Sequence, residues 1–183
     1  MPRPKTVSDE DVLAAALEVL ATHGTNFTLT ELARHVGLSR ATLIQRFGDR
    51  DAILLKLAQR EVSMTRAWLN GLPIENGPDG LWRFLTRIVE SMGTGDGFSV
   101  RVLIASLEAA DPALRALAGE RYGLVQDAIA ARLPDDPRRH ETARHLHAVI
   151  AGAAMQWVAT NRSMGLSAFV LHRLRWSLEK QSN

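Results

Sequence analysis

The 183-residue sequence contains no cysteine, one tyrosine and no long uninterrupted run of apolar residues. Without cysteine the fold cannot rest on disulfides or use a thiolate, and a reducing compartment is compatible with the sequence. No stretch reaches the roughly 18 apolar residues of a membrane span, and residues 1–12 lack the apolar core of a signal peptide. We therefore expect a cytoplasmic protein with no membrane partner.

The sequence also lacks a large excess of charge of either sign. The 22 Lys and Arg residues stand against 20 Asp and Glu residues, which leaves a formal net charge of +2. This balance does not by itself indicate nucleic-acid binding, so any basic surface must be local. Hydrophobic residues make up 46% of the chain, as in ordinary folded proteins, so disorder is not expected over most of its length.

Sustained alternation of apolar and polar residues, the pattern of a half-buried strand, is missing as well. Apolar residues instead recur at helical spacing along most of the chain, which predicts an all-α fold. Glycine, proline and aspartate separate the helical segments, and residues 71–80 form the clearest linker. Helices are expected over about 8–24, 28–37, 39–48, 50–69, 81–92, 98–110, 112–132, 138–163 and 167–180.

Two short helices meet at Gly37 within residues 28–47, TLTELARHVGLSRATLIQRF. Thr28 and Glu31 have the spacing of a capping box at the start of the first helix, and Ser39 can cap the second. Gly37 tolerates the positive φ that a tight turn between the helices requires. The segment therefore predicts a helix-turn-helix, in which the second helix enters the DNA major groove.

The outer side of the second helix carries Arg40, Ala41, Gln45 and Arg46. Arginine can pair with the O6 and N7 atoms of guanine, and glutamine with the N6 and N7 atoms of adenine. A small alanine lets the helix approach the groove or meet a thymine methyl group. The alternative interpretation is an ordinary solvated helix face, which the surrounding motif makes less favourable.

Residues 14–57 resemble the DNA-binding region of TetR-family repressors. The family pattern joins a T-x-x-x-[IL]-A helix, a G-[VL]-S turn and a T-L-Y-x-[HY]-F recognition helix. The matching positions are Leu32, Ala33, Gly37, Leu38, Ser39, Thr42, Leu43 and Phe47. Ile44 stands where the family usually has a phosphate-binding Tyr, Arg46 where it usually has His, and Arg50 where it has a phosphate-contacting Lys.

The resemblance implies a helix-turn-helix DNA-binding domain over residues 1–48 and a helical ligand-binding and dimerisation domain over residues 49–183. It also implies contacts with double-stranded operator DNA from the helix starts, the recognition helix and the N-terminal arm. Arg3 and Lys5 could equally be a featureless tail. The expected DNA-binding residues are Thr28, Thr30, Ser39, Arg40, Ala41, Thr42, Gln45, Arg46, Arg50, Arg3 and Lys5.

The last two predicted helices resemble those through which the family dimerises. Each carries an apolar stripe at helical spacing, so we expect a homodimer, and Trp157→Glu is expected to give monomers. The expected dimer-interface residues are Leu146, Ile150, Ala153, Ala154, Trp157, Phe169, Val170 and Leu174.

A family member of this kind is expected to bind a small, mainly apolar effector inside its helical bundle. Large apolar and aromatic residues between the fourth and seventh helices could line such a cavity, although residues at this spacing can also be plain core. The expected pocket residues are Trp68, Trp82, Met92, Phe98, Leu103, Leu107 and Tyr122.

Catalysis, cofactors and metal binding are not expected. His140, His145 and His147 do not share one helix face, and no nucleophile elbow or phosphate-binding loop is present. The sequence thus predicts a repressor released from its operator by a small apolar molecule. Two alternatives stay open: an architectural DNA-binding protein, which a ligand-sensitive, sequence-specific footprint would exclude, and a helical enzyme, which turnover of a bound ligand would reveal.

Overall fold

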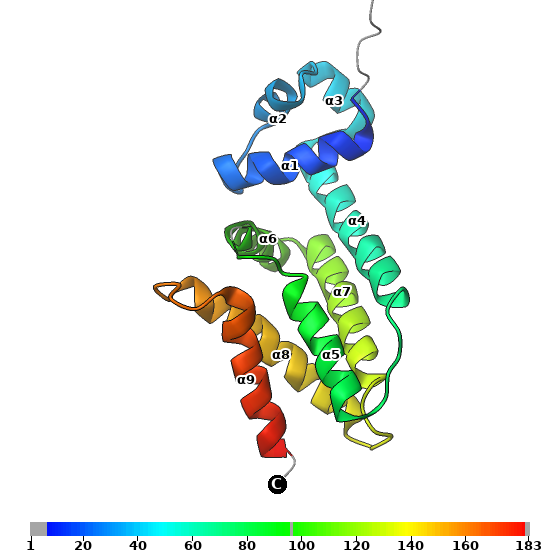
Figure 1. The fold of residues 1–183 in the computed structure, drawn as a ribbon. Helices are drawn as coiled ribbons and strands as arrows, with labels where there is room; N and C mark the ends of the chain where they lie inside the picture. Colours follow the sequence, from blue (N-terminus) through cyan, green and yellow to red (C-terminus); the bar gives the residue numbers. More distant parts are fainter. Residues whose placement is uncertain (1–6, 96, 182–183) are drawn as a thin grey trace, which may run out of the picture. The chain divides into compact units, whose positions relative to one another are not determined.

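The computed structural model describes residues 7–95 and 97–181, and these residues form nine α-helices and no strand (Figure 1). The all-α prediction is therefore confirmed for the described part of the chain. None of these helices combines the length and the apolar character that crossing a bilayer requires. The helices are α1 (Asp9–His23), α2 (Leu29–Val36), α3 (Arg40–Phe47), α4 (Arg50–Asn70), α5 (Gly77–Glu90), α6 (Phe98–Ala110), α7 (Pro112–Ala130), α8 (Arg139–Val158) and α9 (Leu166–Gln181).

Capping side chains fix the first turns of α1, α2 and α3. Ser8 Oγ accepts a hydrogen bond from the backbone N–H of Asp11 at 3.0 Å, and the Asp11 carboxylate accepts one from the Ser8 N–H at 2.9 Å. Thr28 and Glu31 form the same reciprocal pair at 3.2 and 2.7 Å. The Thr28 backbone and side-chain hydrogen bonds hold the pKa of the Glu31 carboxyl below its ordinary value. Ser39 accepts from the backbone N–H three residues on, so all three starts are satisfied by side chains.

Two helix boundaries differ from the predicted ones. α5 begins at Gly77, inside the predicted linker 71–80, because Pro78 suits a first helical turn, where its missing N–H needs no partner. Gly80 lies within this turn, and a Cβ there would come within 2.5 Å of preceding backbone. The glycines and proline that predicted a loop therefore belong to a helix start. α8 ends at Val158, earlier than predicted.

The chain divides into two compact units. Residues up to Ser63 join Val100–Ala118 in the first unit, and Met64–Ser99 join the chain from Gly119 onward in the second. α4, α6 and α7 therefore contribute to both units. The division of functions at residue 48 stays a prediction, because compactness does not report on function.

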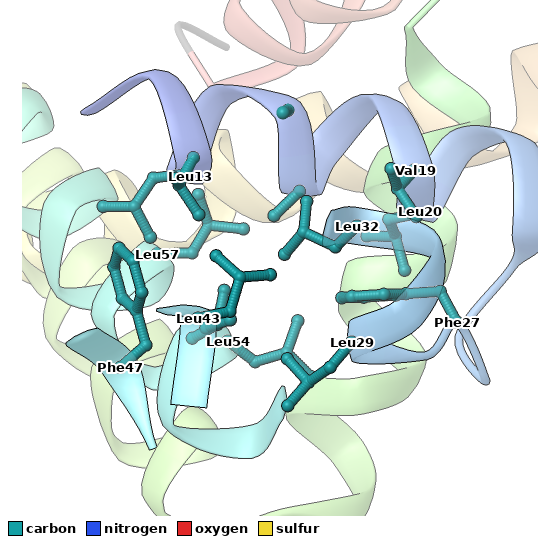
Figure 2. Close-up of a cluster of buried hydrophobic side chains, with 14 of the residues drawn as sticks. Leu13, Val19, Leu20, Phe27, Leu29, Leu32, Leu43, Phe47, Leu54 and Leu57 are labelled. Atoms are coloured by element: carbon teal, nitrogen blue, oxygen red, sulfur yellow. The ribbon is translucent and has the colours of Figure 1, made fainter. Parts of the chain in front are cut away.

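The first unit is held together by a cluster of buried side chains from α1, α2, α3 and α4 (Figure 2). Leu20 of α1, Leu32 of α2 and Leu43 of α3 are fully buried. Burying one such side chain stabilises a fold by about 1.5–3 kcal/mol. The apolar side of α6 adds Leu103 and Leu107, which pack against the same cluster. The short helices α2 and α3 thus rest on a firm core.

In the second unit α8 packs along α9, and α5 packs against α9 (Figure 1). Trp157 of α8 is buried and links two loops of this unit. Its indole Nε1 donates to the Met164 carbonyl at 2.7 Å, and the Arg162 guanidinium lies 5.0 Å from the ring centroid. Gly95 lies so close that a Cβ there would come within 2.4 Å of the ring. The connections before α6 and after α8 therefore both depend on this side chain.

Two glycine-to-alanine substitutions should change stability in opposite directions. Gly37 has φ 71°, in the left-handed region, whereas Gly119 lies inside α7, and neither position has an atom within 4 Å of an added Cβ. Gly37→Ala should lower the free energy of unfolding by about 1–2 kcal/mol through backbone strain. Gly119→Ala should raise it by about 0.5–1 kcal/mol. Urea denaturation checks both, and a stabilising Gly37→Ala would contradict the turn geometry.

Stability should fall in mild acid because of His147. Burial, and then the charge of Arg121, lower the pKa of this imidazole from 6.5 to about 4. Below pH 6.5 the imidazole is protonated in the unfolded chain, whereas in the folded chain it stays neutral down to about pH 4. The free energy of unfolding is therefore unaffected by this group above pH 6.5 and falls as the pH drops from 6.5 to about 4. Moving from pH 7.5 to pH 5 should therefore cost about 2 kcal/mol at this site.

The Gln126 side-chain amide lies 3.4 Å from Nδ1 of His147. His147→Gln should remove this part of the acid sensitivity, as measured by urea midpoints at the two pH values. The matched control is His140→Gln, because His140 is exposed at the start of α8. Equal pH dependence in the wild type and His147→Gln would exclude His147 as the source.

Candidate nucleic-acid interface

The turn between α2 and α3 is built around Gly37. Its φ of 71° and ψ of 27° are left-handed, and the Leu38 N–H donates to the Ala33 carbonyl at 2.9 Å. Ala33 is buried, so the small residue lies at the crowded side of α2. Leu32 and Leu43 then pack in the common core of the two helices (Figure 2). The geometry is that of a helix-turn-helix.

Helix α3 turns one side to the core and the other to solvent. Leu43 and Phe47 are buried, whereas Arg40, Ala41, Ile44 and Gln45 are exposed. With about 100° of rotation per residue, the exposed side chains follow one another around the helix in the order Arg40, Ile44, Ala41, Gln45. They occupy one continuous sector of roughly 140° that is free to enter a DNA groove.

Arg46 is held against the start of α1. Its Nε donates to the Asp9 carboxylate at 3.0 Å, and one terminal nitrogen donates to the Val7 carbonyl at 3.0 Å. The second terminal nitrogen also pairs with Asp9, and the guanidinium lies 5.4 Å from the Phe47 ring centroid. Arg46 is thus half-buried and engaged within its own unit, a role that the sequence pattern did not indicate. Asp9 was not among the expected site residues.

Arg50 begins α4 and is also engaged. It donates to the Thr25 carbonyl at 2.9 Å and to the Asp51 carboxylate at 3.0 Å, and its guanidinium lies 5.8 Å from the Phe27 ring centroid. These contacts fix the guanidinium beside the connection between α1 and α2. Such a fixed cation is suited to bind a phosphate with its remaining donors.

The other expected DNA-binding residues fall into three groups. Thr28, Thr30 and Ser39 are exposed at helix starts, where backbone N–H groups favour anions. Thr42 is half-buried and lies 2.8 Å from the Ser39 hydroxyl. Arg3 and Lys5 lie outside the described residues.

Comparison with known proteins agrees with this geometry. Residues 12–57 match the model of the family described as bacterial regulatory proteins, tetR family. The helix-turn-helix region of the chain is thus similar to that of the TetR family. The members of that family are bacterial regulatory proteins.

One relative of this chain is the HTH-type transcriptional repressor AcnR of Corynebacterium glutamicum. The two are 27% identical over 129 residues, which make up 70% of this chain and 65% of that protein. The matched chain thus spans just under two thirds of the relative's length.

Solved structures share the fold over nearly the whole chain. A transcriptional regulator from Rhodococcus sp. Rha1 has a TM-score of 0.78 at 18% identity, covering 94% of this chain and 97% of that one. A regulator from Saccharomonospora viridis in complex with choline has a TM-score of 0.70 at 22% identity, covering 90% and 92%.

The residues expected to line a ligand pocket are divided between the two units of this chain. Leu103 and Leu107 pack against the core of the first unit, whereas the others belong to the second. Phe98 is buried, and Trp82 and Met92 are half-buried. Trp68 and Tyr122 are exposed by 37% and 41%, so they have the most accessible surface for a ligand.

The residues expected at a dimer interface all lie in the second unit. Leu146, Ile150, Ala153, Ala154, Trp157, Val170 and Leu174 are buried within the chain itself, and Phe169 is half-buried. The apolar stripe indicates that these residues are buried, but it does not indicate which surface buries them. In this structure they lie in the core of the second unit. Trp157→Glu would thus place a charge in that core rather than at a surface between subunits.

The outer face of α8 and α9 instead carries a shallow, open groove of about 910 Å³. Trp176, which is 61% exposed, lines this groove, and so does Gly152, which has open space where a Cβ would be. His145 and Ser177 are joined across it at 2.8 Å. The lining residues are His145, Ala148, Val149, Gly152, Ala153, Gln156, His172, Arg173, Trp176 and Ser177.

Proposed function

We propose that this protein is a cytoplasmic, homodimeric repressor of the TetR family that binds a specific operator and leaves it when a small, mainly apolar molecule binds. The observation that carries the proposal is the exposed sector of α3. Arg40 and Gln45 flank this sector, and each can form two hydrogen bonds with a purine in the major groove. A buried core behind α3 keeps the sector in place.

Phosphate contacts would set the position of α3 on the duplex. The exposed starts of α2 and α3 offer backbone N–H groups, and Arg50 offers a guanidinium already held by Thr25. Arg46 would add a phosphate contact if DNA displaced Asp9. Several such contacts make binding strongly dependent on salt, because each releases counterions from the DNA.

Dimerisation would use the groove on the outer face of α8 and α9. Trp176 offers a large exposed apolar surface, and the open space at Gly152 would let a partner helix approach closely. A two-fold dimer presents two recognition helices, so its operator should be an inverted repeat with half-sites about one DNA turn apart or a multiple of that.

The choline bound to the similar Saccharomonospora viridis regulator supports binding of a small molecule by this fold. The half-buried side chains of Trp82 and Met92 in the second unit support a mainly apolar one. A ligand releases DNA only if it prefers the released conformation, and a tenfold preference supplies about 1.4 kcal/mol per site. Thermal-shift screening would find ligands. If every stabilising compound left operator affinity unchanged, the sensor part of the proposal would fail.

Selection from a pool of random duplexes tests the DNA-binding proposal. We expect enrichment of one inverted repeat, and a footprint on it that a stabilising ligand weakens. Enrichment of a bent or deformable sequence class with no ligand response would favour the architectural alternative. Recovery of an unenriched pool would refute sequence-specific regulation.

A further inference from the structure

Ile44 is an exception within the first unit. Among the described residues of that unit it alone is a large hydrophobic side chain that lies exposed, with 41% of its surface accessible. Leu20, Leu32 and Leu43, its apolar counterparts on α1, α2 and α3, are fully buried. Core packing therefore does not account for an isoleucine at this position.

Its neighbours on α3 indicate what it meets. Around the helix Ile44 lies between Arg40 and Ala41, with Gln45 beyond Ala41. An apolar strip of two residues is thus flanked by two side chains that can hydrogen-bond to base edges. If Arg40 and Gln45 bind base edges, Ile44 faces the surface between those bases.

That surface must itself be apolar. An isoleucine can neither donate to a phosphate nor accept from a base, so it would leave polar groups opposite it without partners. In the major groove the apolar group is the 5-methyl of thymine. Arginine and glutamine beside the isoleucine are complementary to purines on either side of such a methyl group.

We propose that Ile44 is a specificity-determining residue that recognises the 5-methyl group of a thymine in each operator half-site. This inference rests on the proposed DNA-binding function. Ala41, being small, leaves room for the methyl group to approach the helix. Ile44 then contributes to base preference, even though its side chain cannot bind phosphate.

The experiment removes the methyl group and the side chain in turn. Each thymine of the selected inverted repeat is replaced by deoxyuridine, symmetrically in both half-sites, and the dissociation constant is measured by fluorescence anisotropy. For the wild type one position should weaken binding about fourfold per half-site, which is the effect of one buried methyl-sized group. Ile44→Ala should bind thymine and uracil duplexes equally at that position, and Ile44→Val should keep part of the discrimination.

Ile74→Ala is the matched control, because Ile74 is an isoleucine that is 64% exposed outside α3. It should discriminate thymine from uracil as the wild type does. The inference is overturned if no thymine position is sensitive in the wild type, or if Ile44→Ala retains the sensitivity. Either result leaves the preference for the selected repeat, and hence the proposed function, intact; a pool that yields no preferred repeat overturns both.

Discussion

Truncation of Trp157 to alanine is expected to lower the free energy of unfolding by about 3–5 kcal/mol, enough to unfold a marginally stable domain. The side chain is 3% exposed, its Nε1 donates to Met164, and its ring fills the space beside Gly95. Alanine would leave a cavity and an unpaired carbonyl, and would release two loops at once. Urea denaturation followed by circular dichroism gives the measurement.

Trp176→Ala is the paired control, because it is the same substitution on the adjacent helix at a site 61% exposed. It should leave the unfolding of the protomer almost unchanged and should instead weaken self-association, as seen by light scattering. If Trp157→Ala were as stable as Trp176→Ala, the placement of Trp157 in the core of the second unit would be refuted.

Alanine at Arg40 or Gln45 should cost about 1–3 kcal/mol for each interaction with a base that the substitution removes. A two-fold dimer makes each of these interactions twice, so operator affinity should fall by about 2–6 kcal/mol in total, while affinity for random duplex changes little. Filter binding to the selected and to a scrambled duplex separates these effects.

Arg50→Ala and Arg34→Ala serve as comparisons. Arg50 offers a phosphate contact, so its loss should weaken binding to every sequence alike and reduce the salt dependence by about one counterion per subunit. Arg34 is exposed near the end of α2, outside the α3 sector, and its loss should not alter base preference. If Arg34→Ala relaxed base preference as much as Arg40→Ala, α3 would not be the element that enters the groove.

The helix-turn-helix could be predicted because its signals are local. Gly37 at a left-handed turn and the Thr28–Glu31 capping box depend on residues a few positions apart, and the structure has both. The boundaries of α5 were harder, because the sequence GPDG is compatible with a loop and with a helix start that carries proline in its first turn.

Partners far apart in sequence could not be predicted in the same way. The ion pair between Arg46 and Asp9 joins residues 37 positions apart, and nothing in the recognition-helix pattern indicates it. The apolar stripe of α8 likewise gives a buried face without naming the surface that buries it. Within the second unit α9 packs against both α8 and α5, and the stripe residues of α8 are buried there. The stripe therefore belongs to the core of one chain.

The central claim is that the exposed sector of α3 reads a DNA sequence, and the ratio of two dissociation constants tests it most directly. Affinity for the selected inverted repeat and for a scrambled duplex of equal length should be measured together at about 150 mM salt, where sequence-independent binding through phosphate contacts is weaker than at low salt. We predict a ratio of at least about 10³, falling toward one in the Arg40→Ala, Gln45→Ala double variant. A ratio near one for the wild-type protein, or a ratio that the double variant leaves unchanged, would contradict the account.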